Sequence, residues 1–131
     1  MISFSVPGDP VPQPRPRVST RGGFARAYVP AKHPVHAYRQ AVRLTARIAG
    51  LRERAEPMSV CIVAVFKRPA SHVTSKGVVK ATAPKVPRPD VDNIAKAVLD
   101  ALGEFFDDTL VESLSVSKSF GDVASTKVVI A

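Results

Sequence analysis

The sequence predicts a single α+β domain in which two main helices pack on a mixed β-sheet. Segments at residues 2–6, 58–67, 109–120 and 126–131 alternate apolar and polar residues or are rich in β-branched residues, as strands are. Two segments with the apolar spacing of amphipathic helices lie between these strands. A chain of 131 residues with 45% hydrophobic content is long enough to bury one core, so we expect one domain over residues 1–131.

The N-terminal strand ISFSV is followed by a cluster of Pro and Gly that extends to about Arg17. The next stretch, RGGFARAYVP at residues 21–30, predicts a glycine turn and a short strand. Its arginines and aromatic residues are interleaved, with Arg21 and Arg26 flanking Phe24 and Tyr28. This pattern suits the gripping of phosphate and sugar, and it equally fits a short edge hairpin with solvated arginines.

Residues 34–50 predict the first main helix. Pro34 is suited to the first turn, Gly50 marks the end, and an approximate apolar stripe runs between them. The stripe consists of Val35, Tyr38, Val42, Ile48 and Ala49. Arg39, Arg43 and Arg47 recur every four residues and therefore share one side of the helix. They form either a row that follows a phosphate backbone or an ordinary solvated face.

The segment MSVCIVAVFK at residues 58–67 is apolar at nearly every position, which predicts a central strand. Its Cys61 is the single cysteine of the chain, so no internal disulfide can form, and we expect it to be a small core residue. The apolar run is far shorter than the ~20 residues that span a bilayer, and the N-terminus lacks the features of a signal peptide. We therefore expect a soluble, cytoplasmic protein with no membrane partner.

Residues 69–89 show no periodicity, contain no acid and are rich in Pro, Ser, Thr and Lys. Loops of this length are uncommon in compact domains unless they bind a ligand or are disordered. We interpret the segment as a mobile basic loop that contacts DNA, and disorder in the free protein is compatible with that role.

Charge divides the chain into two unequal parts. The formal net charge is +8 and the pI is about 10.2, which favours an anionic partner such as nucleic acid. Residues 90–112, however, hold seven of the eleven acids and one base, Lys96, so this segment carries −6 and the remainder +14. A basic protein with no polyanion partner remains the simpler alternative.

The acidic segment begins with a second amphipathic helix, whose apolar residues recur at positions 91, 94, 95, 98, 99 and 102. Asp92 and Lys96 lie along one flank of it, Asp90 stands at its entrance, and Asp107 and Asp108 follow its end. Asp90 could cap the helix and Asp92 could pair with Lys96. If instead the following strand returns Asp108 to the helix start, three carboxylates converge and form a hard oxygen site suited to Mg²⁺.

The stretch RPDVDNIAKAVLDAL followed by the aspartate pair resembles the RusA family of Holliday junction resolvases, many of which are encoded by phages and prophages. The stretches VPGDPVPQPRPRV and ARAYVP support the resemblance in the same order along the chain. The spacing D-x-D-N-x-x-K-A-x-x-D-A-L with a nearby DD pair is far more specific than a bare D-x-D. One departure is Leu110, where many relatives have glutamine.

The resemblance implies a RusA-like homodimer that uses Mg²⁺, or Mn²⁺ as a substitute, to introduce paired nicks across a four-way DNA junction in recombination and repair. The matching positions imply metal-binding carboxylates at Asp90, Asp92 and Asp108 and an essential base at Lys96, all four being catalytic. Asp107 is then a supporting neighbour and Asp100 is structural. The expected DNA contacts are basic residues of the two basic segments: Arg15, Arg17, Arg21, Arg26, Lys76, Lys80, Lys85 and Arg88.

Two other functions fit the residues. The chain could be a noncatalytic nucleic-acid-binding protein whose acids stabilise a helix, or a nuclease for other branched DNA such as flaps. The absence of cleavage with either Mg²⁺ or Mn²⁺ would favour the first, and cleavage of flaps would favour the second.

Overall fold

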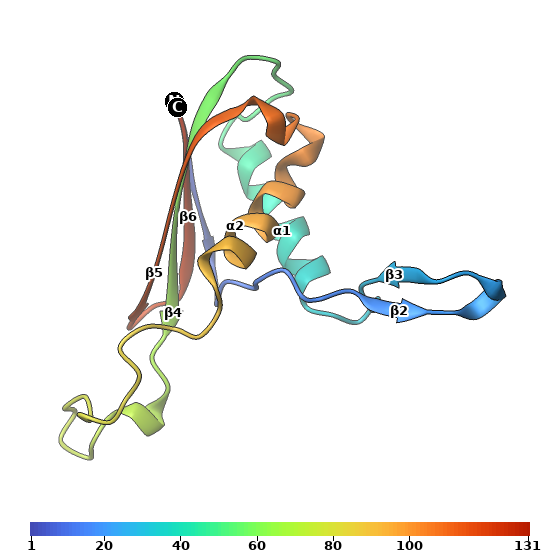
Figure 1. Cartoon of the computed structure of the whole chain (residues 1–131). Helices are drawn as coiled ribbons and strands as arrows, with labels where there is room; N and C mark the ends of the chain where they lie inside the picture. Colours follow the sequence, from blue (N-terminus) through green and yellow to red (C-terminus); the bar gives the residue numbers. More distant parts are fainter.

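The computed structural model describes all residues 1–131 and confirms the predicted α+β class with a mixed sheet (Figure 1). The main sheet has four strands in the spatial order β1-β6-β4-β5. They are β1 (Ile2–Pro7), β4 (Met58–Lys67), β5 (Val111–Gly121) and β6 (Ser125–Ile130). β4 is parallel to β5 and antiparallel to β6, and β6 is antiparallel to β1. No helix in this fold combines the length and the apolar character that crossing a membrane requires.

The central position predicted for β4 is confirmed, since β4 pairs with a neighbour on each side. Its residues alternate between two environments: Val60 and Ile62 are buried, whereas Cys61 and Val63 are only partly covered. Both helices lie on one face of the sheet, and the other face carries none (Figure 1). The prediction that Cys61 is a core residue is therefore wrong, because its position in the alternation places it on the uncovered face.

The first main helix, α1 (Val35–Ile48), has a buried stripe of Val35, Tyr38, Val42 and Ala46. Its predicted continuation to Ile48 is wrong, because that side chain is 78% exposed. At ~100° per residue, Ile48 lies about 140° around the helix from Val35, whereas Ala46 lies within about 20° of it. Ala49 is also exposed, since it follows the end of the helix.

The second main helix, α2 (Val91–Ala101), lies beside α1 and buries most of its predicted apolar stripe in the same core. The exception is Val91 in the first turn, which is 41% exposed. It runs in the direction opposite to the two parallel strands that it connects, so its beginning and its end lie at different levels of the sheet (Figure 1). A turn after Gly121 joins β5 to β6, but these strands are not neighbours, because β4 lies between them.

A two-stranded hairpin, β2 (Arg17–Ser19) paired with β3 (Arg26–Tyr28), projects from the body of the protein (Figure 1). We call residues 15–28 the arm; none of them is buried.

The basic loop at residues 69–89 contains a short 3-10 turn and a bridge between Val73 and Val79. Its base is attached to the sheet through Phe120, which the Arg68 guanidinium covers at 4.8 Å. The mobility of this loop stays a prediction.

Candidate active site

The beginning of α2 presents two carboxylates to solvent. Asp90 adopts the extended backbone of an N-cap residue, with φ −70° and ψ 142°, yet its side chain makes no capping hydrogen bond. Asp92, in the first turn, accepts one hydrogen bond from the Asn93 backbone N–H at 3.0 Å. Both residues are exposed. The capping role that the sequence allowed for Asp90 is therefore not realised, and its carboxylate remains available to a ligand.

Two contacts from distant parts of the chain fix this helix entrance. The Gln13 backbone N–H donates to the Asn93 carbonyl oxygen at 2.9 Å, which holds the segment leading to the arm against α2. The Lys118 ammonium, in β5, donates to the Pro89 carbonyl oxygen at 2.8 Å. Lys118 thus places a positive charge one residue before Asp90. Sequence reasoning missed it, and the only available signal was that it is the single base of a serine-rich strand.

Lys96 lies one helical turn after Asp92, but it does not pair with it. Its ammonium is 3.8 Å from the Asp100 carboxylate, which the Arg39 guanidinium also approaches at 3.5 Å. The Asp92–Lys96 ion pair that the sequence allowed is therefore absent. Asp100 has two cationic partners and joins α2 to α1, which is a structural role.

The row of arginines on α1 faces the end of α2. Besides the contact of Arg39, Arg43 donates through Nε to the Ala101 carbonyl oxygen at 3.2 Å, and Arg47 pairs with Glu104 at 2.7 Å. Carbonyl groups at the C-terminal end of a helix carry partial negative charge, so arginines are favourable there. The row is therefore not simply a solvated face, because its partners are acids and a carbonyl of the same chain, although Arg47 is still 58% exposed. Contact of the row with a phosphate backbone stays a prediction.

Asp107 and Asp108 have different environments. Asp107 begins a 3-10 turn at Asp108–Leu110 and accepts the Thr109 backbone N–H at 2.9 Å. This hydrogen bond lowers the pKa of the Asp107 carboxyl below its ordinary value. Asp108 is exposed and has no cationic partner within ion-pair distance. Leu110 is half-buried and packs against the core, so an apolar residue fits at this position.

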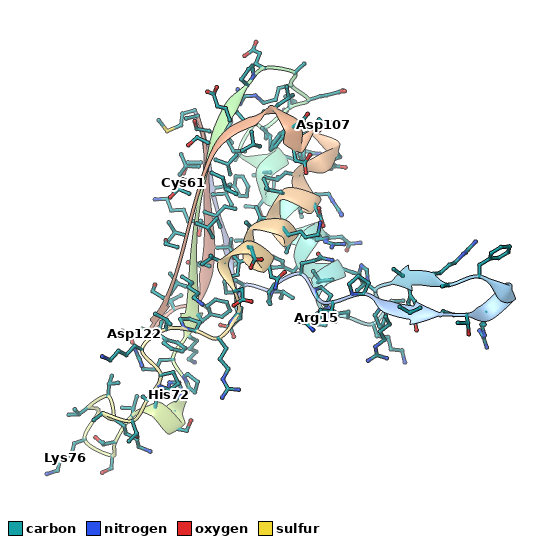
Figure 2. All side chains as sticks on the ribbon, in the orientation of Figure 1. Arg15, Cys61, His72, Lys76, Asp107 and Asp122 are labelled. Atoms are coloured by element: carbon teal, nitrogen blue, oxygen red, sulfur yellow. The ribbon has the colours of Figure 1, made fainter.

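Asp108 lies at the opposite end of α2 from Asp90. The hydrogen bond from Lys118 places Pro89 beside the far half of β5. Along that strand, Lys118 lies roughly 23 Å from Val111, since a strand rises ~3.3 Å per residue. Asp108 precedes Val111, and Figure 2 shows Asp107 at the end of the helix distant from its start. No three side chains of His, Cys, Asp or Glu approach closely enough to hold a metal ion.

The expectation that the strand returns Asp108 to the helix start within one chain is therefore wrong. The physical reason is the parallel pairing of β4 and β5. Parallel strands require the chain to travel back along the sheet before the second strand begins, and α2 makes this return. The carboxylates before and after α2 are consequently separated by its length.

The eight predicted DNA-contacting residues are all exposed and fall on two projections. Arg15, Arg17, Arg21 and Arg26 belong to the arm, and Lys76, Lys80, Lys85 and Arg88 belong to the basic loop. Figure 2 shows Arg15 at the base of the arm and Lys76 at the outer part of the loop. The loop leads directly into Asp90, and the Gln13–Asn93 contact holds the segment before the arm next to it. Both basic projections therefore originate near the beginning of α2.

The acids of residues 90–112 fall into two groups. Asp100 and Glu104 are ion-paired, and Asp107 caps a turn. The other four, Asp90, Asp92, Asp108 and Glu112, have no cationic partner and cap no turn. Mg²⁺ is commonly bound by one or two carboxylates together with substrate phosphates, so the exposed pair Asp90 and Asp92 offers a suitable part of such a site.

Comparison with known proteins gives two findings. The profile of the family described as "Endodeoxyribonuclease RusA" matches residues 7–131. The chain is also 34% identical over 144 residues to "Uncharacterized protein YqaN" of Bacillus subtilis (strain 168), an alignment that covers 98% of this chain and 94% of that protein.

Proposed function

The chain belongs to the RusA family of endodeoxyribonucleases, and on that basis we propose that it resolves four-way DNA junctions by paired, Mg²⁺-dependent nicks. In this role it acts in DNA recombination and repair on branched DNA. Resolution requires two cuts on symmetry-related strands, which a homodimer with two-fold symmetry supplies geometrically. We expect Mn²⁺ to support the same reaction in place of Mg²⁺, because the proposed ligands are carboxylate oxygens.

The sorting of the acids carries this proposal. Asp90, Asp92 and Asp108 are the carboxylates proposed for the metal, and each is exposed and lacks a cationic partner. Of the other acids in the segment, Asp100, Glu104 and Asp107 are used in ion pairs and a turn cap, and Glu112 alone is also unpaired. Like charges left unpaired around one helix are unfavourable unless they are separated or a cation joins them. Exposure of these three carboxylates is what a metal-dependent nuclease needs.

We assign the complete centre to two copies of the chain. Asp90 and Asp92 of one subunit are joined by Asp108 of the partner subunit, and the symmetric arrangement occurs on the other side. In a two-fold interface, contact of residue i with residue j necessarily repeats as contact of j with i. Two equivalent centres result, each incomplete in a single subunit. The separation of Asp108 from Asp90 along α2 supports this arrangement.

The chain's residues have distinct roles in the proposed reaction. Asp90 and Asp92 would hold the divalent ion, which when bound would supply water activation and neutralisation of charge on the scissile phosphate. Lys96, one turn after Asp92, stabilises negative charge as it develops. Lys118 is a positioning residue, since its bond to the Pro89 carbonyl fixes the backbone that carries Asp90.

The arm and the basic loop supply most of the DNA affinity in this proposal. They carry the eight exposed basic residues, and they extend in different directions from the body of the protein (Figure 1). Contacts of this type are electrostatic, so affinity falls steeply as salt is raised. Each subunit then holds one duplex of the four-way junction beside its own α2.

The decisive experiment compares Asp90→Asn with Asp122→Asn on a labelled four-way junction. Asp122 is an exposed aspartate in the turn between β5 and β6. We expect Asp90→Asn to retain junction binding and to lose nicking by at least ~100-fold, as removal of a group that stabilises the transition state does, whereas Asp122→Asn cuts normally. Unchanged nicking by Asp90→Asn would reject the site. If the unmodified protein cuts no four-way, flap or Y-shaped DNA in Mg²⁺ or Mn²⁺, the noncatalytic binding protein replaces this proposal.

A further inference from the structure

The arm has features that a stabilising hairpin does not need. None of residues 15–28 is buried, so the arm contributes little to the core. Residues 10–52, which include the arm, contain no acid at all. Short hairpins are marginal in water by themselves, and this one projects from the body (Figure 1). Its large apolar side chains, Val18, Phe24 and Tyr28, are exposed. These properties favour a surface that is completed by a polyanionic partner.

The tip of the arm exposes one large aromatic side chain. Phe24 is 74% exposed and directly follows Gly22 and Gly23, whose φ values are 79° and 81°. Residues with a Cβ rarely adopt this left-handed conformation, so the two glycines allow an abrupt reversal. Neither glycine has a neighbouring atom within 4 Å of its would-be Cβ. The tip is therefore thin, and Phe24 stands next to it without packing partners in the core.

A hollow lies behind the tip. It has a volume of about 580 Å³, and its lining combines two guanidinium groups with a phenol ring and two hydroxyl groups. The lining residues are Ser19, Thr20, Arg21, Arg26 and Tyr28. Guanidinium groups bind phosphate, and an aromatic ring stacks on a base. This combination, at this size, suits a nucleotide.

We propose that the arm recognises the branch point of junction DNA, with Phe24 stacking on a base that is unpaired at the crossover and with Arg21 and Arg26 holding the adjacent phosphates. This inference rests on the proposed function and adds the means by which the enzyme distinguishes a branch from a duplex. In a duplex both faces of each base are already stacked. At a branch point the stack is interrupted, so an apolar wedge can take the vacant place at a smaller unstacking cost.

Charge favours DNA over a second protein copy as the occupant. Outside residues 90–112 the chain carries +14, so most of the surface of another copy repels an arm with four arginines. Phosphates attract the same arm. The exposed aromatic residue then gains a partner with a π-face, which a phosphate backbone alone does not provide.

The test uses a four-way junction with 2-aminopurine, a base whose fluorescence rises on unstacking, at the crossover, in the absence of divalent cations. We expect the unmodified protein to change the fluorescence and to prefer the junction to a linear duplex. Phe24→Ala should weaken junction binding by roughly 5- to 150-fold, the equivalent of the ~1–3 kcal/mol of one base–aromatic stack, with little change for the duplex. Phe24→Trp should restore binding, and Phe24→Leu should not. Ile48→Ala is the matched control, since Ile48 is 78% exposed but lies on α1.

Three outcomes decide the matter. A loss of both the fluorescence change and the junction preference in Phe24→Ala, with rescue by Trp, supports the inference. If Phe24→Ala keeps the preference of the unmodified protein, or instead abolishes a dimer in sedimentation experiments, the branch-point role is wrong while the proposed nuclease function stands. If the unmodified protein neither prefers nor cuts junctions, the proposed function itself fails.

Discussion

Mixing two inactive variants should restore nicking if the catalytic centre is shared between subunits. Asp90→Asn and Asp108→Asn each remove one carboxylate from both centres of a homodimer. In a mixed dimer, one centre combines both substitutions, and the other combines the intact Asp90 of one subunit with the intact Asp108 of its partner. The basis of this prediction is the separation of the two residues along β5, which is on the order of 20 Å.

The expected magnitude follows from counting centres. Random exchange of equal amounts gives mixed dimers in about half of the population, and each has one intact centre of two, so about a quarter of the centres should be active. The product should also change. Because a mixed dimer has only one active centre, it nicks one strand of a junction and does not make the paired cuts that release linear products.

The assay mixes the purified variants, allows subunits to exchange under mild denaturant, and follows cleavage of a supercoiled plasmid that extrudes a cruciform. Nicked circles should form with the mixture, and linear plasmid should remain rare. Each variant alone is the control. A mixture as inactive as its components, after exchange is verified with a size-tagged subunit, would show that each centre is built from a single chain. Full activity of Asp108→Asn alone would remove that residue from the centre.

Two further predictions concern stability. Arg39→Ala should lower the free energy of unfolding by about 1–3 kcal/mol in urea denaturation, because the Arg39 side chain is only 16% exposed and binds both Gln13 and Asp100; Arg47→Ala, whose pair with Glu104 is half exposed, should cost less than about 1 kcal/mol. Equal losses would contradict the importance of burial at Arg39. Burial raises the pKa of Tyr38, whose hydroxyl shares a hydrogen bond of 2.7 Å with Thr126. The stabilisation that the buried, protonated Tyr38 hydroxyl contributes is thus complete below the unfolded pKa of about 10 and is lost as the pH rises above it. The urea concentration at the unfolding midpoint should therefore decrease above pH 10 in the unmodified protein and decrease less steeply in Tyr38→Phe.

Local patterns predicted the elements that local physics determines. The apolar spacing of residues 91–102 anticipated α2, and the continuous apolar run of residues 58–67 anticipated the central strand. Both patterns reflect which side of an element is buried, and that side is encoded in consecutive residues. Even so, the pattern wrongly predicts Ile48 as part of the stripe of α1, because a stripe with approximate spacing extends to any apolar residue near the end of a helix.

The contacts between elements could not be predicted in the same way. The spacing of Arg39, Arg43 and Arg47 showed that they share a face, but it did not show that the face lies against the end of α2. The position of Asp108 likewise depended on whether β5 runs parallel or antiparallel to β4. Strand order is a long-range property, and an alternating pattern is the same for either direction.

The fold also changes what the charge segregation means. The excess of acid in residues 90–112 drew attention to a metal site, yet part of that excess attaches α2 to α1 through Asp100 and Glu104. These acids would be present in a noncatalytic protein with the same helix packing, so the net charge of the segment is weak evidence for catalysis. The stronger evidence is the subset that the fold leaves without partners. Asp90 makes this clear, because an N-cap aspartate that makes no capping bond forgoes ~1 kcal/mol of helix stability, a cost that is understandable if its carboxylate has another ligand.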